Sequence, residues 1–215
     1  MKRYFQVARE AVAYYVSDTD LQHLLAVLIG NRATPEMCGK LSAIGIRELA
    51  ERCDMILICV KPLDYPHVLE ELIPVVRPHQ IVVSITSPIM IRQLESRLNG
   101  KIVKMIPSVT NGALSGTLLF AYGERIGQDD RTRLERLFGA IGKPVEIDER
   151  LTRIASDLSS CGPAFFAWML RKWVEAAVAE TGIDPALANH LACEMLYGTG
   201  RLLTEYGMTP AELET

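Results

Sequence analysis

The amino-acid sequence predicts an α/β domain built on a parallel or mixed sheet, followed by an all-α segment. Two observations lead to this prediction. Short apolar runs alternate with helical stretches up to about Arg150, and beyond that residue the pattern is helical alone. Alternation of strands and helices is typical of a sheet that helices cover on both faces.

Composition narrows the class of protein. The chain has 215 residues, of which 49% are hydrophobic and 23% charged, as in soluble proteins of one large or two small domains. The net charge of −3 argues against a nucleic-acid binder, which usually carries a basic excess. No apolar run approaches the roughly 18 residues that a membrane span needs. The N-terminus lacks the apolar stretch of a signal peptide, and the five scattered cysteines form no C-x-x-C pair. We therefore expect a reduced, cytoplasmic chain.

The elements of the first part follow from periodicity and from the residues that bound each run. Residues 3–16 have a helical spacing of apolar side chains, and Leu24–Ile29 suits a buried strand, although a helical turn fits it as well. Met55–Val60 is apolar throughout and bounded by charges, which is typical of a fully buried parallel strand. Further strands are predicted at Ile81–Thr86, Ile102–Pro107, Gly116–Tyr122 and Val145–Ile147, with helices at Pro35–Leu41, Ile46–Cys53, His67–Val76, Ile89–Leu98 and Asp129–Ile141.

Two long helices are predicted after Arg150. The first covers Ala164–Glu180 and stops at Gly182. The second begins after Asp184, an N-cap followed by proline, and runs to Gly207. Residues 209–212 form a capping box with few residues behind it, so we expect a chain that is truncated at its C-terminus.

The helix Ala164–Glu180 is apolar on more than one side. A lone surface helix keeps a polar face, whereas a helix with several apolar faces needs burial on several sides. Two interpretations remain open, a core helix of this chain and a subunit interface. The residues that raise the question are Phe165, Phe166, Trp168, Met169, Trp173 and Val174.

Motifs for metal and phosphate binding are absent from the sequence. The four histidines are far apart, and His190 with Cys193, one helical turn away, supplies only two ligands. No P-loop sequence occurs. Gly198-Thr199-Gly200, the one G-x-G, falls inside a predicted helix, where small residues let another helix approach closely.

The pair Asn31-Arg32 closes the first apolar run. In a dinucleotide-binding sheet the end of the second strand meets the adenosine ribose, and an arginine there accommodates the 2′-phosphate of NADP. An ordinary solvated arginine is the alternative. Three later strands also end in small or polar residues and a proline, at Val60–Pro62, Ser84–Pro88 and Ile106–Asn111. Ligands of open α/β sheets bind at such carboxyl ends, so three in series favour a shared ligand site.

In their order along the chain, these segments resemble the pyrroline-5-carboxylate reductase family. The individual motifs are most similar to those of the family's late competence (ComER) branch. The resemblance covers about residues 31–215. The matching strings are Asn31-Arg32 before Thr34-Pro35-Glu36, ICVKP at Ile58–Pro62, VSITSP at Val83–Pro88, MIPSVTN at Met105–Asn111 and LSSCGPAF at Leu158–Phe165.

The resemblance implies hydride transfer from NADPH or NADH to the C=N carbon of 1-pyrroline-5-carboxylate, which gives L-proline; the cofactor supplies the redox chemistry. It places Ser159 and Glu205 near the substrate, and it makes the helices after Arg150 a dimerisation domain. The residues that it places at the cofactor are Asn31, Arg32, Cys59, Val60, Lys61, Pro62, Ile85, Thr86 and Ser87.

The chain departs from the family pattern at three places. The family's opening strand and G-x-G-x-x-G turn have no counterpart, because no glycine precedes Gly30. The segment with the catalytic threonine would lie beyond Thr215. Within the pocket motifs, Ser160-Cys161 and Ser87-Pro88 replace the family's Gly-Ser and Ala-Gly.

We therefore expect a Rossmann-type domain over residues 1–150, with 1–22 atypical, and a helical dimerisation domain over 151–215. The leading hypothesis is a pyrroline-5-carboxylate reductase-type enzyme that uses NADP or NAD, acts on a small imino acid, forms a homo-oligomer, and binds neither nucleic acid, membrane nor metal. A second hypothesis is a non-catalytic competence protein of the same fold that acts through protein interactions. A third is a related oxidoreductase with His190 or Lys172 as acid/base.

Overall fold

A computed structural model describes residues 46–214 of the chain. The helix at 3–16, the strand Leu24–Ile29, the helix Pro35–Leu41 and the pair Asn31-Arg32 lie outside the described residues. The described part divides into two compact units, one ending at Cys161 and one running from Gly162 onward. The predicted boundary near Arg150 stays a prediction.

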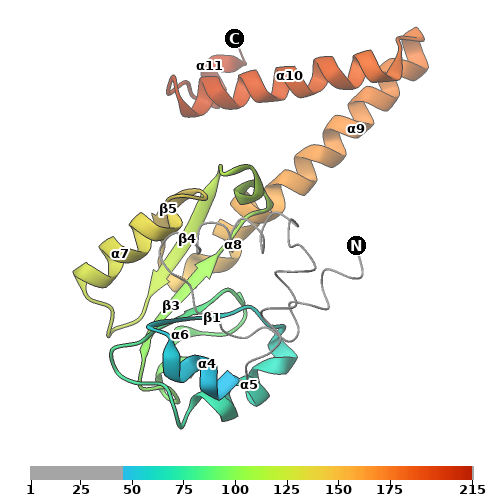
Figure 1. The fold of residues 1–215 in the computed structure, drawn as a ribbon. Coiled ribbons are helices and arrows are strands. Elements are labelled where there is room, and N and C mark those ends of the chain that lie inside the picture. The colour runs from blue at the N-terminus through green and yellow to red at the C-terminus, as the bar shows by residue number, and fades with distance from the viewer. Residues whose placement is uncertain (1–45, 215) are drawn as a thin grey trace. The chain divides into compact units, whose positions relative to one another are not determined.

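The first unit is built on a mixed five-stranded sheet in which the strands lie in sequence order (Figure 1). Adjacent strands β1, β2 and β3 are parallel, β4 runs antiparallel to β3, and β5 is parallel to β4. The five strands predicted within residues 46–214 are confirmed, with ends that shift by one or two residues. Their bounds are β1 Met55–Ile58, β2 Ile81–Ser84, β3 Lys101–Ile106, β4 Thr117–Tyr122 and β5 Lys143–Glu146.

Helices follow the strands as the alternating pattern predicted. The α-helices of this unit are α4 Ile46–Arg52, α5 Tyr65–Leu72, α6 Ile91–Glu95, α7 Gln128–Phe138 and α8 Thr152–Ser156, with the short 3₁₀ turns η1 Pro62–Asp64, η2 Val109–Ala113 and η3 Glu149–Leu151. Helix α6 is shorter than predicted because the Gln93 side chain accepts a hydrogen bond from the backbone N–H of Met90 at 2.8 Å, so the helix begins only after Met90.

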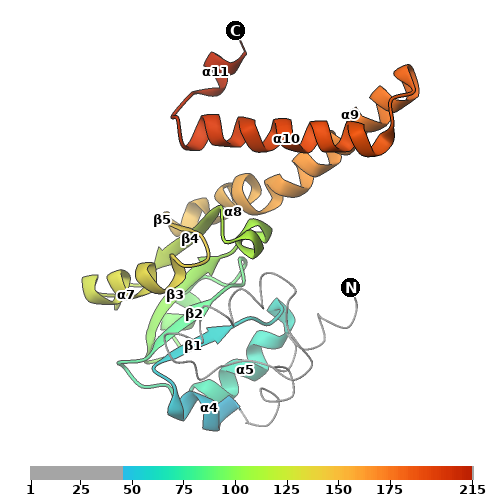
Figure 2. The same ribbon diagram turned by 45° about the horizontal axis from the view of Figure 1, so that its top comes forward.

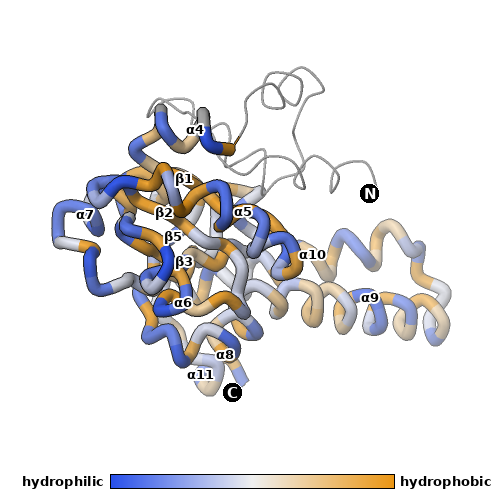
Figure 3. The backbone as a smooth tube through the Cα atoms, turned by 90° about the horizontal axis from the view of Figure 1, so that it is seen from below, coloured by the Kyte–Doolittle hydropathy of each residue, from blue (hydrophilic) through white to orange (hydrophobic). Residues whose placement is uncertain are grey.

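Both faces of the sheet are covered, as expected for parallel strands. Successive side chains of a strand point to opposite faces. Ile56 and Ile58 accordingly pack with α4, α5 and α6, whereas Leu57 packs on the other face with Leu134 and Phe138 of α7. The two helix layers are visible in Figure 2. In Figure 3 the strands β1 and β2 are mainly orange, whereas α7 is mainly blue, since only one side of this helix meets the sheet.

The second unit consists of helices α9 Gly162–Thr181, α10 Pro185–Thr204 and α11 Pro210–Leu213. Asp184 caps α10 by accepting a hydrogen bond from the Leu187 N–H, and Thr209 forms the predicted capping box with Glu212. Helix α10 ends at Thr204 instead of the predicted Gly207 because Gly207 adopts a positive φ of 71°, which no longer continues a right-handed helix.

Helix α9 is not a core helix of the described chain. Gly162 is its one buried residue, and the Trp168 and Trp173 side chains are 57% and 64% exposed. Within the described residues this exposure disfavours the core interpretation, and the subunit interface stays a prediction. None of the helices in residues 46–214 is long and apolar enough to cross a membrane.

The packing of α7 on the sheet gives a test of the core. Phe138 is fully buried, with its ring centroid 5.7 Å from that of Phe120 on β4. We expect Phe138→Ala to lower the free energy of unfolding by about 3–5 kcal/mol in urea denaturation, because it leaves a cavity. Leu63→Ala, at a position 92% exposed, should change it by less than about 0.5 kcal/mol. Equal effects of both substitutions would contradict this packing.

Candidate functional site

The carboxyl ends of β1, β2 and β3 meet at one edge of the sheet because the three strands are parallel. The segments that leave this edge are 59–62 after β1, 85–90 after β2 and 107–113 after β3. The structure therefore brings together seven of the predicted cofactor residues, Cys59, Val60, Lys61, Pro62, Ile85, Thr86 and Ser87.

Buried hydroxyls fasten the first two segments to each other. The Thr86 hydroxyl donates to the backbone oxygen of Val60 at 2.8 Å, and the Ile85 N–H donates to the oxygen of Ile58 at 3.2 Å. Below them, the hydroxyls of Tyr65 and Ser84 form a buried hydrogen bond of 2.5 Å. Burial raises the pKa of Tyr65, although the hydrogen bond to Ser84 opposes the shift. These hydrogen bonds hold the segments that follow β1 and β2 in a fixed position relative to each other.

The third segment is held by Ser108 and Asn111. The Ser108 N–H donates to Asn111 Oδ1 at 2.7 Å, and the fully buried Asn111 amide donates to the backbone oxygen of Ser115 at 2.9 Å. The Ser108 hydroxyl donates to the backbone oxygen of Ser159 at 2.9 Å. Ser159 belongs to a π-helical turn, η4 Asp157–Cys161. One hydrogen bond therefore joins the end of β3 to the segment that was predicted to meet the substrate.

A charged pair lies beneath the second segment. Lys104 on β3 is 1% exposed, and its Nζ donates to the backbone oxygen of Ser87 at 3.0 Å. The same Nζ lies 2.7 Å from Glu149 Oε1. Sequence reasoning assigned no role to either residue. A single lysine inside an otherwise apolar strand was the signal that could have found the pair, because a buried ammonium needs a partner.

Comparison with known proteins shows which families resemble this chain in sequence. The family model described as NADP oxidoreductase coenzyme F420-dependent matches residues 26–88, and the model described as pyrroline-5-carboxylate reductase dimerisation matches 149–215. ComE operon protein 4 of Bacillus subtilis is 39% identical over 167 residues, which are 77% of this chain and 61% of that protein. Pyrroline-5-carboxylate reductase 3 of the same organism is 31% identical over 168 residues, 78% of this chain and 62% of that protein.

The chain is similar to the pyrroline-5-carboxylate reductase family in both its sequence and its fold. It spans about 61–62% of the length of these curated relatives. Solved structures agree on the fold. The pyrroline carboxylate reductase of Plasmodium falciparum, solved with NADP bound, aligns with a TM-score of 0.76 at 20% identity, over 95% of this chain and 83% of that one. The enzyme from Coxiella burnetii gives the same score and identity over 92% and 80%. The Rossmann-type sheet followed by a helical domain is therefore confirmed.

Ser160 and Cys161 are one of the two local departures from the reductase family pattern, the other being Ser87-Pro88. Ser160 and Cys161 lie in the η4 turn, where the Ser159 hydroxyl donates to the Ala155 oxygen at 2.8 Å. π-Helical turns inside longer helices are frequent at functional sites. The altered residues therefore sit in the irregular turn that also presents the Ser159 oxygen to Ser108.

The described structure does not place the predicted residues Asn31, Arg32 and Glu205 relative to this edge. Asn31 and Arg32 lie outside the described residues. Glu205 lies in the second unit at the end of α10, where Arg201 lowers its pKa through a 2.7 Å ion pair. Its place near the substrate stays a prediction.

The two candidate acid/base residues, Lys172 and His190, both lie on exposed helix surfaces. Lys172 pairs with Glu175 at 2.7 Å on the exposed side of α9, and His190 is exposed on α10. Residues 46–214 hold no cluster of three or more His, Cys, Asp or Glu side chains that could bind a metal. The structure adds nothing that favours the third hypothesis.

The reactivity of the Cys59 thiol tests whether the segment that follows β1 is packed as described. Burial raises the pKa of its thiol to about 12, and the thiolate is the reactive form. At pH 8 we expect iodoacetamide to leave Cys59 unmodified in the folded protein and to modify it after unfolding in guanidinium chloride, as read by peptide mass spectrometry. Rapid labelling of Cys59 in the folded protein would show that this segment is open.

Proposed function

We propose that the chain is a pyrroline-5-carboxylate reductase-type oxidoreductase in which NADPH or NADH reduces the C=N bond of 1-pyrroline-5-carboxylate to L-proline. One observation carries the proposal. Three of the motifs that match the family, Ile58–Pro62, Val83–Pro88 and Met105–Asn111, meet at a single sheet edge, in a chain 31% identical to a curated reductase. Residues 1–150 form the nucleotide-binding domain in this proposal, and residues 151–215 form the dimerisation domain.

The residues at the edge fit a nicotinamide dinucleotide. Cys59, Val60 and Thr86 are small and uncharged, so a flat ring and its phosphates can approach the backbone closely. The exposed Lys61 places a positive charge beside an anionic ligand. The nearby Glu149 carboxylate is neutralised by Lys104 and therefore does not repel phosphates. NADP is favoured over NAD by Arg32, which accommodates a 2′-phosphate in sheets of this type.

Each part of the chain has a distinct task in this reaction. When bound, the cofactor supplies the hydride, and the chain binds and orients the two reactants. Segments 59–62 and 85–87, which are hydrogen-bonded to each other, bind the cofactor. The turn around Ser159 lies next to the imino acid. The link between Ser108 and Ser159 keeps the two positions at a fixed separation, which is the main contribution of a protein to a hydride transfer. A cytoplasmic location belongs to the same proposal, because Cys59, Cys161 and Cys193 are free thiols.

The second candidate is a competence protein that acts through protein contacts. It is favoured by the 39% identity to ComE operon protein 4, which exceeds the 31% identity to the reductase. Binding of the nicotinamide cofactor distinguishes the two functions, because a purely structural partner has no need of it.

Loss of absorbance at 340 nm on mixing the protein, NADPH and pyrroline-5-carboxylate tests the proposal. We expect turnover, and we expect Lys61→Glu to raise the Kd for NADPH in calorimetry about three- to tenfold, because it reverses a charge beside the phosphates. Arg77→Glu is the matched control, since Arg77 is exposed and precedes β2 at the opposite edge. NADPH binding without turnover of this imino acid would contradict the substrate. No binding at all would favour the second candidate.

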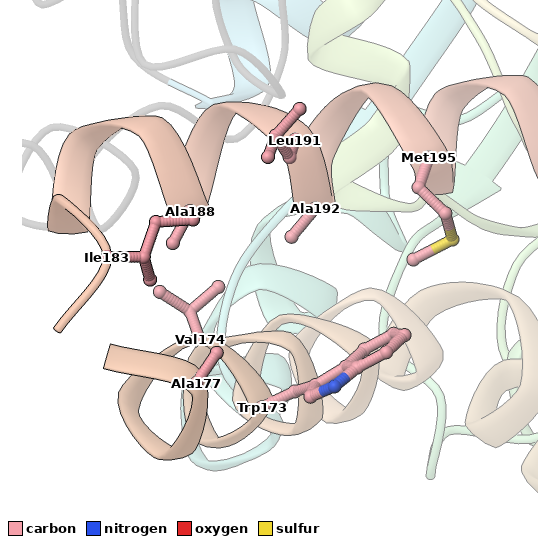
Figure 4. Close-up of a pocket in the computed structure, with 8 residues that line it drawn as sticks. All are labelled: Trp173, Val174, Ala177, Ile183, Ala188, Leu191, Ala192 and Met195. Atoms are coloured by element: carbon pink, nitrogen blue, oxygen red, sulfur yellow. The ribbon is translucent and has the colours of Figure 1, made fainter. Parts of the chain in front are cut away.

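We propose further that the chain forms a homo-oligomer through α9 and α10. The two helices pack on each other near their connection and leave an apolar cavity of about 250 Å³, lined by Trp173, Val174, Ala177, Ile183, Ala188, Leu191, Ala192 and Met195 (Figure 4). Phe165, Phe166 and Tyr197 are also 57–66% exposed. Exposed apolar surface of this extent is typical of a contact between proteins. A Cβ atom added at Gly198 or Gly200 would meet nothing within 4 Å, so packing in the described chain does not require these glycines.

Sedimentation at micromolar concentration tests this interface. We expect the wild type to be at least a dimer and Trp168→Glu to weaken self-association about thirtyfold or more, as large aromatic side chains at interfaces do. Asn189→Glu introduces the same charge at an exposed polar position of α10 and serves as the control. A monomeric wild type, or equal effects of both variants, would refute the proposal.

A further inference from the structure

Lys104 stands out because a lysine side chain is rarely found in the interior of a sheet. It is 1% exposed and lies in a strand whose other residues, Lys101 apart, are apolar. Taking an ammonium group out of water is costly unless it is both neutralised and hydrogen-bonded. Glu149 supplies the charge at 2.7 Å, and the Ser87 oxygen supplies an acceptor at 3.0 Å.

The Glu149 carboxylate has a second task. Its Oε1 atom also accepts a hydrogen bond from the backbone N–H of Ile91 at 2.8 Å, at the first residue of α6. The segment 87–91 is thus held at both ends by one ion pair, at Ser87 through Lys104 and at Ile91 through Glu149. This segment follows β2 at the edge assigned to the cofactor.

Glu149 is itself fixed in the segment that leads to Ser159. Its backbone oxygen accepts a hydrogen bond from the Thr152 hydroxyl at 2.6 Å, at the start of α8. Helix α8 continues into the η4 turn with Ser159. The ion pair therefore links segment 87–91 to the α8–η4 segment that carries Ser159. Both charged side chains are largely shielded from solvent, with Lys104 2% and Glu149 18% exposed.

We propose that Lys104 and Glu149 are a positioning pair, which holds segment 87–91 against the η3–α8 turn in the conformation that binds the nicotinamide cofactor. The cofactor part of this statement rests on the proposed function. The pair acts through the backbone of Ser87 and Ile91 and does not itself touch a ligand. If the pair is broken, the segment samples other conformations, and the apparent Kd rises by the inverse of the competent fraction.

Amide hydrogen exchange and NADPH binding test the proposal. In Lys104→Met and in Glu149→Gln, we expect exchange in peptides covering 87–91 to become at least about tenfold faster, and the Kd for NADPH to rise about tenfold, as for a segment that is competent a tenth of the time. Peptides covering β1 and α5 should keep their exchange rates. Glu149→Gln keeps an acceptor for the Ile91 N–H and carries the test if Lys104→Met does not fold.

The chain offers a matched control on the same strand. Lys101 pairs with Asp130 at 2.7 Å at the opposite end of β3, with side chains 29% and 16% exposed. Lys101→Met should therefore leave both the exchange of segment 87–91 and the Kd for NADPH unchanged. Equal changes in the control and in the Lys104 variant would overturn the proposal, because they would show a general loss of stability.

The two proposals fail in different ways. Unchanged exchange of segment 87–91 in both pair variants overturns the positioning pair, whatever the protein binds. Faster exchange together with no NADPH binding by the wild type supports the mechanical role of the pair and contradicts the proposed cofactor.

Discussion

Burial of β1, β2 and β3 on both faces is the constraint on which the rest of the first unit depends. Helices cover each face, so the strands carry apolar side chains on both sides, and apart from Lys104 the buried polar groups gather where the strands end. The parallel direction then gathers three of these ends at one edge. The site is thus a consequence of the sheet's architecture, and its backbone is held by hydroxyls such as those of Thr86 and Ser108 because few other polar groups are within reach.

The sequence was a good guide to the elements and to the edge where they meet. Apolar runs with a proline after them, as at Val60–Pro62 and Ser84–Pro88, predicted both the strands and their shared polar ends. The reversal at β4 could not be predicted, because the run Gly116–Tyr122 has the same pattern in a parallel or an antiparallel strand. The π-helical turn around Ser159 was not predicted, although Pro163, which has no N–H to donate to the Ser159 oxygen, follows it closely in the sequence.

The site was predicted less completely than the fold. Residues at strand ends, such as Lys61 and Ser87, could be predicted to lie at this edge because their position in the sequence is also their position in the sheet. Lys104, Glu149 and Asn111 were missed, since their roles depend on contacts between segments far apart in the chain. The second unit shows the opposite case. The apolar surface of α9 was recognised from composition alone, whereas the exposure of Trp168 and Trp173 could be read only from the structure.

The buried pair also constrains how this sequence can diverge. Replacing one partner leaves the other as an uncompensated charge in the interior, whereas replacing both by apolar residues of similar volume is often tolerated. A substitution of Lys104 alone is therefore destabilising, because it leaves Glu149 without its counter-charge, unless Glu149 is replaced as well. The Ile91 amide adds a further condition, because the residue at 149 must still offer an acceptor. The effects of substitutions at these two positions are therefore coupled, and the conformation of the segment between Ser87 and Ile91 depends on both.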